Sequence, residues 1–173
     1  MLMLYIINIS RFALCFIFLY SLVSKLRDIA GFENTIKNFQ LLPGSLHRPT
    51  AIGFMLGEMV VFVAAVLGGN WLFLCYGLAI SLLVLFIYAL HSVLQRKIQT
   101  SCNCFGMSEQ KVSSYDIWRN TAIILIAGLG LISLVLNTQP SHMDILKWLL
   151  SSIVAFVLSL LLLNLRELLE LII

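Results

Sequence analysis

Five long hydrophobic stretches, separated by short polar segments, make up most of the sequence. Each stretch is close to the ~20 residues that an α-helix needs to cross about 30 Å of hydrocarbon. Because backbone N–H and C=O groups in lipid must pair within their own element, open strands are excluded there. We therefore predict an all-α integral membrane fold with five transmembrane helices, over residues 3–24, 50–68, 71–94, 119–137 and 145–165.

Residues at the ends of these stretches support the predicted boundaries. Trp71, Trp118 and Trp148 each stand at the start of a stretch, and amphipathic rings of this kind favour the headgroup level of a bilayer. The short segment Gly68-Gly69-Asn70 joins the second stretch to the third, which makes these two helices antiparallel. The sequence shows no internal repeat or low-complexity linker, so we expect residues 1–173 to form a single transmembrane domain.

The polar segment between the first two stretches contains a short amphipathic pattern. Phe32, Ile36 and Phe39 recur at i, i+4 and i+7, which is the spacing of one face of a helix. Pro43-Gly44 then ends the pattern. We predict a short interfacial helix with its aromatic face in the acyl boundary. This helix either rests on the bundle or forms a lid over the polar segment that follows the third stretch.

Composition supports a membrane protein and excludes one class of partner. Hydrophobic residues make up 61% of the 173 residues and charged residues 11%, whereas about 25% of a soluble domain is charged. The net charge is only +3, and the basic residues form no stripe with interleaved aromatic residues. We therefore expect the lipid bilayer as a partner and no nucleic acid.

The polar segment after the third stretch carries the residues with the most chemistry. It reads Thr100-Ser101-Cys102-Asn103-Cys104-Phe105-Gly106. Two cysteines at i and i+2 are within disulfide range, but the closed ring is so small that its geometry should be strained. Strained or exposed disulfides are the labile or catalytic ones. We predict that Cys102 and Cys104 are catalytic in thiol/disulfide exchange. Incidental loop cysteines and metal binding are the alternatives.

Other residues are candidates for a supporting role. Glu58 lies within the second stretch, where a carboxylate is costly and suggests a functional site. Lys25, at the matching end of the first stretch, is its natural partner, so Glu58 either forms a structural ion pair or handles protons. His91, near the end of the third stretch, is a candidate for assisting thiol deprotonation or fills the interface. Cys15 and Cys75 lie in hydrophobic stretches and are best read as small buried side chains.

Small residues predict where helices approach one another. Gly53 and Gly57 form a GxxxG pattern, and Ala64 and Gly68 continue the same spacing. Such patterns let helix backbones come close together. Packing within the bundle is the expected use, and dimerisation is the alternative.

Basic residues divide unevenly between the two faces of the predicted bundle. Nine of the eleven follow the first, third or fifth stretch. They are Lys25, Arg27, Lys37, Arg48, Arg96, Lys97, Lys111, Arg119 and Arg166. The positive-inside rule places this face, and with it Cys102 and Cys104, in the cytoplasm. Disulfide exchange is more useful in an oxidising compartment, so function favours the external face, which we adopt as the expectation.

Several of these segments together resemble a known family. The end of the first stretch (Ser21 to Asp28), the amphipathic stretch through Leu41-Leu42-Pro43 and the pair Gly57-Glu58 resemble the DoxX-like membrane fold. The Cys102–Gly106 segment is similar to the methylamine-utilisation MauE branch of that fold. The layout also resembles the four-helix core of vitamin K epoxide reductase-type enzymes, which have a redox cysteine pair at the end of a membrane helix.

The resemblance implies a multi-pass protein of the inner cell membrane that handles disulfides. It implies a role in methylamine metabolism, in the maturation of the disulfide-rich small subunit of a quinoprotein amine dehydrogenase. It also implies a client protein with thiols or a disulfide, a separate thioredoxin-like partner, and a quinone as the cofactor to consider. Phe105 and Gly106 enter as supporting residues because they complete the family's cysteine motif.

Two other functions stay open beside thiol exchange. The first is metal handling, in which the two thiols and either His91 or His47 bind Cu(I) or Zn(II). A structural zinc site has four ligands, and the sequence offers only two convincing ones, so we predict no metal site. The second is a non-catalytic scaffold of a maturation or export complex.

Overall fold

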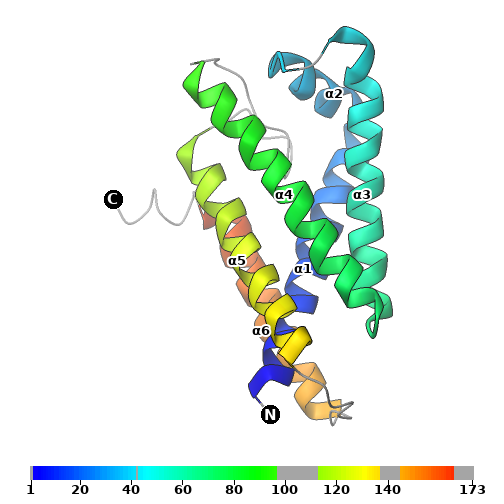
Figure 1. The fold of residues 1–173 in the computed structure, drawn as a ribbon, viewed down its shortest axis with the longest axis vertical. Coiled ribbons are helices and arrows are strands. Elements are labelled where there is room, and N and C mark those ends of the chain that lie inside the picture. Colours follow the sequence, from blue (N-terminus) through cyan, green and yellow to red (C-terminus); the bar gives the residue numbers. More distant parts are fainter. Residues whose placement is uncertain (1, 42, 97–112, 137–144, 166–173) are drawn as a thin grey trace.

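The fold is an all-α bundle, and the predicted five spans are confirmed. A computed structural model describes residues 2–41, 43–96, 113–136 and 145–165. Five of its helices are long and apolar enough to cross a membrane. These are α1 (Leu2–Arg27), α3 (His47–Leu67), α4 (Trp71–Gln95), α5 (Ser114–Leu136) and α6 (Ile145–Leu163) (Figure 1). The shorter elements are α2 (Ile29–Asn38) and the 3-10 turn η1 (Gly44–Leu46).

Three of the spanning helices extend further than hydropathy predicts. Helix α1 continues to Arg27, α3 begins at His47, and α5 begins at Ser114. At the start of α5, the Asp116 carboxylate accepts a hydrogen bond from the Ser113 backbone N–H at 3.0 Å and pairs with Arg119 at 3.2 Å. A side chain that reaches back to the preceding N–H stabilises a helix start. Polar residues therefore extend these helices beyond the apolar segment that hydropathy detects.

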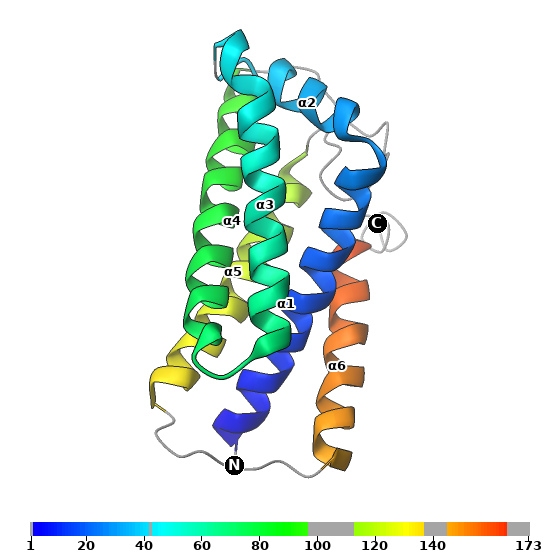
Figure 2. The ribbon, with the colours of Figure 1, turned by 90° about the vertical axis from the view of Figure 1, so that its right-hand side faces the viewer.

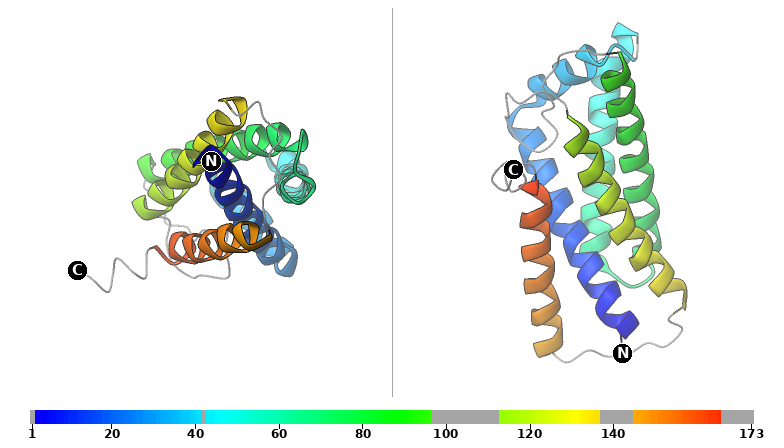
Figure 3. Two further views of the ribbon diagram at one scale, coloured as in Figure 1. Left: turned by 90° about the horizontal axis from the view of Figure 1, so that it is seen from below. Right: turned by 90° about the vertical axis from the view of Figure 1, so that its left-hand side faces the viewer.

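Four of the helices form a closed ring, and the fifth lies outside it. Helix α1 packs against α3 and α5, and α4 packs against α3 and α5. Helix α6 packs along the outer side of α1 and barely touches α5 (Figures 2 and 3). The turn between α3 and α4 uses Gly68 and Gly69, whose φ angles are +70° and +57°. Glycine adopts these positive angles without steric penalty, so the hairpin predicted from this segment is formed.

The contact between α1 and α6 combines aromatic and small residues. The rings of Phe12 and Trp148 meet edge to face with their centroids 4.8 Å apart. Beyond this contact, α6 has the buried small residues Ser151, Ala155 and Ser159. Small side chains let helix backbones approach closely in a bilayer. Helix α6 thus covers one face of α1 without entering the four-helix ring.

The predicted amphipathic helix is present, but its aromatic face packs on the bundle and not in the acyl boundary as predicted. Its N-cap, Asp28, accepts a hydrogen bond from the Gly31 N–H at 2.8 Å, which satisfies one of the free donors of a helix start. Phe32 and Ile36 are buried in one cluster with residues of α3, and Phe39 is buried in another with residues of α4. Helix α2 therefore covers one end of the ring (Figure 2).

Candidate functional site

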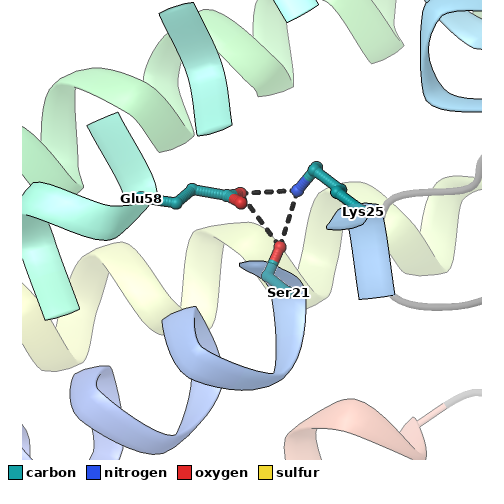
Figure 4. A network of polar contacts seen from close by, with 3 residues as sticks. All are labelled: Ser21, Lys25 and Glu58. Carbon is teal, nitrogen blue, oxygen red and sulfur yellow. Dashed lines mark hydrogen bonds and ion pairs between the residues drawn. The ribbon is translucent and has the colours of Figure 1, made fainter. Parts of the chain in front are cut away.

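A buried polar cluster lies under helix α2. The Lys25 ammonium is 2.5 Å from Oε1 of Glu58 and donates a second hydrogen bond to the Ser21 hydroxyl at 2.6 Å. The Ser21 hydroxyl in turn donates to the same Glu58 oxygen at 2.9 Å. Figure 4 shows the resulting triangle of three side chains. The predicted contact between Lys25 and Glu58 is therefore present, while their supporting role in function stays a prediction.

Three helices build this cluster. Ser21 and Lys25 are four residues apart on α1, so they lie on one face of that helix. Glu58 approaches from α3, and Phe32 of α2 places its ring 5.0 Å from the Lys25 ammonium. A cation at this distance from an aromatic face is attracted by the ring. Because α2 covers it, Lys25 is only 3% exposed. It therefore does not extend toward water as the end of a membrane helix would allow.

Two acceptor atoms of the cluster have no hydrogen-bond partner among the described residues. They are Oε2 of Glu58 and Oδ1 of Asn120. Asn120 is fully buried on α5, and its amide nitrogen donates within that helix to the Asp116 carbonyl at 2.8 Å. Glu58 and Asn120 both line a cavity of about 30 Å³, together with Ser21 and Lys25. Buried acceptors normally find a partner, so these atoms mark a place where one is needed.

A larger cavity adjoins the small one. Its volume is about 470 Å³, and it lies between α2, α3 and α4. Both cavities are lined by Phe32, Phe54 and Phe86. Phe39 and Tyr88 add two more aromatic rings to the larger cavity, and Arg96 contributes a charged side chain. A volume of this size is within the range of small-molecule sites.

The remaining predicted site residues fall into two groups. Cys102, Cys104, Phe105 and Gly106 lie outside the described residues. His91 is exposed on α4 and shares a hydrogen bond of 2.9 Å with Gln95, one turn further along the same helix. His91 lines neither of the two cavities described above. The structure thus leaves its assistance to the thiols as a prediction.

The described residues on either side of the cysteine segment lie at one end of the bundle. Helix α4 ends at Gln95, and α5 begins at Ser114. Arg96 follows α4 directly, lines the larger cavity and donates a hydrogen bond of 3.3 Å to the Gln40 carbonyl just after α2. This is the end that α2 covers (Figure 1). Arg96, the last described residue before the cysteine segment, therefore lines the larger cavity.

The other two cysteines lie inside the helix ring. Cys75 is fully buried and belongs to the main hydrophobic core, and Cys15 packs partly buried against it. Both are free thiols. Among the described residues, no three His, Cys, Asp or Glu side chains come together to hold a metal ion. The positions of Cys15 and Cys75 agree with their reading as small buried side chains.

Sequence reasoning missed two members of the cluster. Ser21 could have been found from its spacing of four residues to Lys25, which places both on one face of a helix. Asn120 carries a weaker signal, because a single amide near a helix start usually bonds to its own backbone. Its side-chain nitrogen does so here. Only the packing of α5 against α1 and α4 shows that Asn120 lines a cavity together with Glu58.

One comparison with known proteins gives a match. The chain matches the model of the family described as "Methylamine utilisation protein MauE" over residues 3–133. This range covers α1 to α5 except for the last residues of α5, and it leaves out α6. No curated protein and no solved structure matches the chain.

Proposed function

The chain belongs to the MauE family and is a multi-pass membrane protein, and on this premise we propose that it exchanges thiols and disulfides with a partner protein during that protein's maturation. The proposal assigns the exchange to Cys102 and Cys104 and places the protein in the inner cell membrane. The observation that supports it most is the family match, which includes the cysteine segment. The client would be a protein of methylamine utilisation.

The proposed reaction starts from the oxidised Cys102–Cys104 pair. A client thiolate attacks one of the two sulfurs, which forms a mixed disulfide and releases the other cysteine as a thiolate. A second client thiolate then attacks the client sulfur of the mixed disulfide. The client gains a disulfide, and both cysteines of the pair become thiols, so two electrons and two protons leave the client. A separate thioredoxin-like partner in its disulfide form accepts them and restores the pair.

Contacts at the end of the bundle next to the cysteine segment support this proposal. Lys25, Ser21 and Glu58 connect α1 to α3 directly under α2. Arg96 connects the end of α4 to the residues after α2. These contacts stabilise the end of the bundle from which the cysteine segment leaves. A rigid support of this kind positions reactive groups better than an isolated loop does.

The proposal is tested by replacing the cysteines in cells that make the client. Changing Cys102 or Cys104 to serine should abolish formation of the client disulfide. One of the two single variants should accumulate a mixed disulfide with the client, visible as a band that reductant removes. Cys15→Ala, which removes a thiol from inside the bundle, is the matched control and should retain activity. Normal client maturation in the Cys102→Ser/Cys104→Ser double variant would instead favour a non-catalytic scaffold.

A labelling experiment tests on which side the exchange takes place. We expect the cysteine segment on the external face, where an oxidising environment favours disulfides. After mild reduction, a thiol reagent that does not cross membranes should then label the segment in intact cells. Labelling that requires cell lysis would place the segment in the cytoplasm, as the positive-inside count predicts. Cys15 and Cys75 lie in the bundle and should stay unlabelled in both cases.

A further inference from the structure

The two adjoining cavities under α2 differ in the chemistry that they offer. The small one is lined by Glu58 and Asn120, whose Oε2 and Oδ1 atoms are buried and have no hydrogen-bond partner among the described residues. The larger one is mostly apolar and aromatic. We propose that together they bind a lipid-soluble ring compound that carries a hydroxyl group, which is the chemistry of a hydroquinone. This inference concerns binding alone and does not depend on the proposed thiol exchange.

The small cavity calls for a ligand that donates a hydrogen bond. Near the cavity, the Ser21 hydroxyl donates to Glu58 Oε1 and the Asn120 side-chain nitrogen donates to the Asp116 carbonyl. A ligand that offers only a carbonyl or an ether oxygen would leave both buried acceptors unsatisfied. An O–H group satisfies one of them, and the charged Glu58 oxygen is the stronger acceptor. A cavity of about 30 Å³ has room for one such group.

The larger cavity suits a ligand with an apolar ring. A ring needs flat apolar walls, and the larger cavity has five aromatic side chains among its lining residues. Aromatic rings attract one another in stacked or edge-to-face arrangements beyond their burial of surface. Phe32, Phe54 and Phe86 line both cavities, so a ring among them is next to the acceptors. An aliphatic chain would gain nothing from the acceptors.

The first experiment compares two ligands of nearly equal shape on the unchanged protein. The probes are a decyl-substituted benzohydroquinone, kept reduced, and its dimethyl ether, which lacks both O–H groups. Binding is measured by calorimetric titration of the full chain in lipid nanodiscs. We expect the hydroquinone to bind about tenfold more tightly or better, since the ether leaves a buried acceptor unsatisfied. Equal affinities would show water as the sole partner of the acceptors and would overturn the proposal, as would the absence of saturable binding.

Two variants locate the binding. In the double variant Lys25→Met/Glu58→Leu, the carboxylate is absent, so the preference for the hydroquinone over its ether should disappear. Replacing both members of a buried ion pair by apolar residues is often tolerated. Ala89→Phe places a ring inside the larger cavity and should abolish binding of both probes. Val84→Phe adds the same ring to an exposed position of α4 and is the matched control.

The outcomes of these variants distinguish the proposed ligand binding from the proposed thiol exchange. A preference that persists in the double variant would overturn the assignment of the hydroxyl to Glu58. Equal loss of binding in Ala89→Phe and Val84→Phe would overturn the assignment of the ring to the larger cavity. Binding should be unchanged in Cys102→Ser/Cys104→Ser, because the proposed site is built from other residues. If a variant does not fold, the comparison of the hydroquinone with its dimethyl ether on the unchanged protein still tests the proposal.

Discussion

Two basic residues of α1 reach α3 at opposite ends of the bundle, and they do so in different ways. Arg11 donates to the backbone carbonyls of Ala65 and Val66 at 2.5 and 2.7 Å. These carbonyls belong to the last turn of α3, where a cation is favoured by the helix dipole. Lys25 instead pairs with the Glu58 side chain in the interior of α3. The first contact stabilises a helix end, whereas the second requires two charges to be buried together.

The packing around Arg11 also differs from the packing around Lys25. Near Arg11 the packing is tight, since a Cβ built on Gly68 would meet the guanidinium at 2.7 Å. Near Lys25 there are two cavities and two acceptors without partners in the described part of the chain. A half-satisfied polar group is a poor choice for stability alone. From this difference we predict a structural role for the Arg11 end and a supporting role in function for the Lys25 end.

The largest effect is expected from breaking the buried ion pair. Glu58→Gln leaves the Lys25 ammonium without its charged partner in a bilayer, and loss of one member of a buried pair costs about 3–5 kcal/mol. The folded yield of the variant should fall sharply. Adding Lys25→Met should restore part of it, because the unpaired charge is then gone. Unfolding measurements on the two single variants and the double variant test this, and additive effects would mean that the two side chains do not interact.

The next effect concerns Gly130, the glycine of the described structure at which a built Cβ would meet the nearest atom. A Cβ built on Gly130 of α5 would lie 2.7 Å from ring atoms of Tyr76 and would also collide with the Ser10 hydroxyl. The Tyr76 hydroxyl donates to the Ile7 carbonyl at 3.0 Å, so the ring cannot move freely. Gly130→Val should therefore lower the free energy of unfolding by about 1–3 kcal/mol, as overpacking does. Gly128→Val, two residues away with nothing within 4 Å of its built Cβ, is the control and should have a small effect.

The limits of prediction follow from the uniform hydrophobicity of the helices. Hydropathy predicts the spans well because crossing a bilayer requires apolar length. It does not predict which face of a helix meets another, because lipid-facing and core-facing residues are both apolar. Leu14 is fully buried while Leu129 is 57% exposed, although they are the same residue type. The pair Lys25–Glu58 was predictable because charges in apolar helices are rare. The contact of Gly130 with Tyr76 lacks any such signal.

A smaller effect is expected from Arg11. Arg11→Met keeps the apolar part of the side chain but removes two hydrogen bonds to the end of α3. Helix-end cations contribute about 0.3–1 kcal/mol when exposed and up to ~2 kcal/mol when partly buried. The free energy of unfolding should thus fall by about 1 kcal/mol, clearly less than for Glu58→Gln. Arg11→Lys should lose less stability than Arg11→Met, because its ammonium keeps the charge and can still donate to a carbonyl of the helix end. A loss as large as that of Glu58→Gln would remove the distinction between the two ends.

The smallest effects are expected at the GxxxG pattern of α3, and they separate its two glycines. A Cβ on Gly57 would lie 3.0 Å from a methyl carbon of Leu82 on α4, whereas a Cβ on Gly53 would meet nothing within 4 Å. Only Gly57 therefore packs within the bundle as the pattern predicts. Gly57→Ala should destabilise slightly, by about 0.5 kcal/mol, because the flexible Leu82 side chain can shift but loses some packing. Gly53→Ala should be neutral or stabilising by a few tenths of a kcal/mol, since alanine favours a helix over glycine. If Gly53→Ala instead weakens the protein or changes its oligomeric state in nanodiscs, the exposed glycine serves a contact between two copies of the chain.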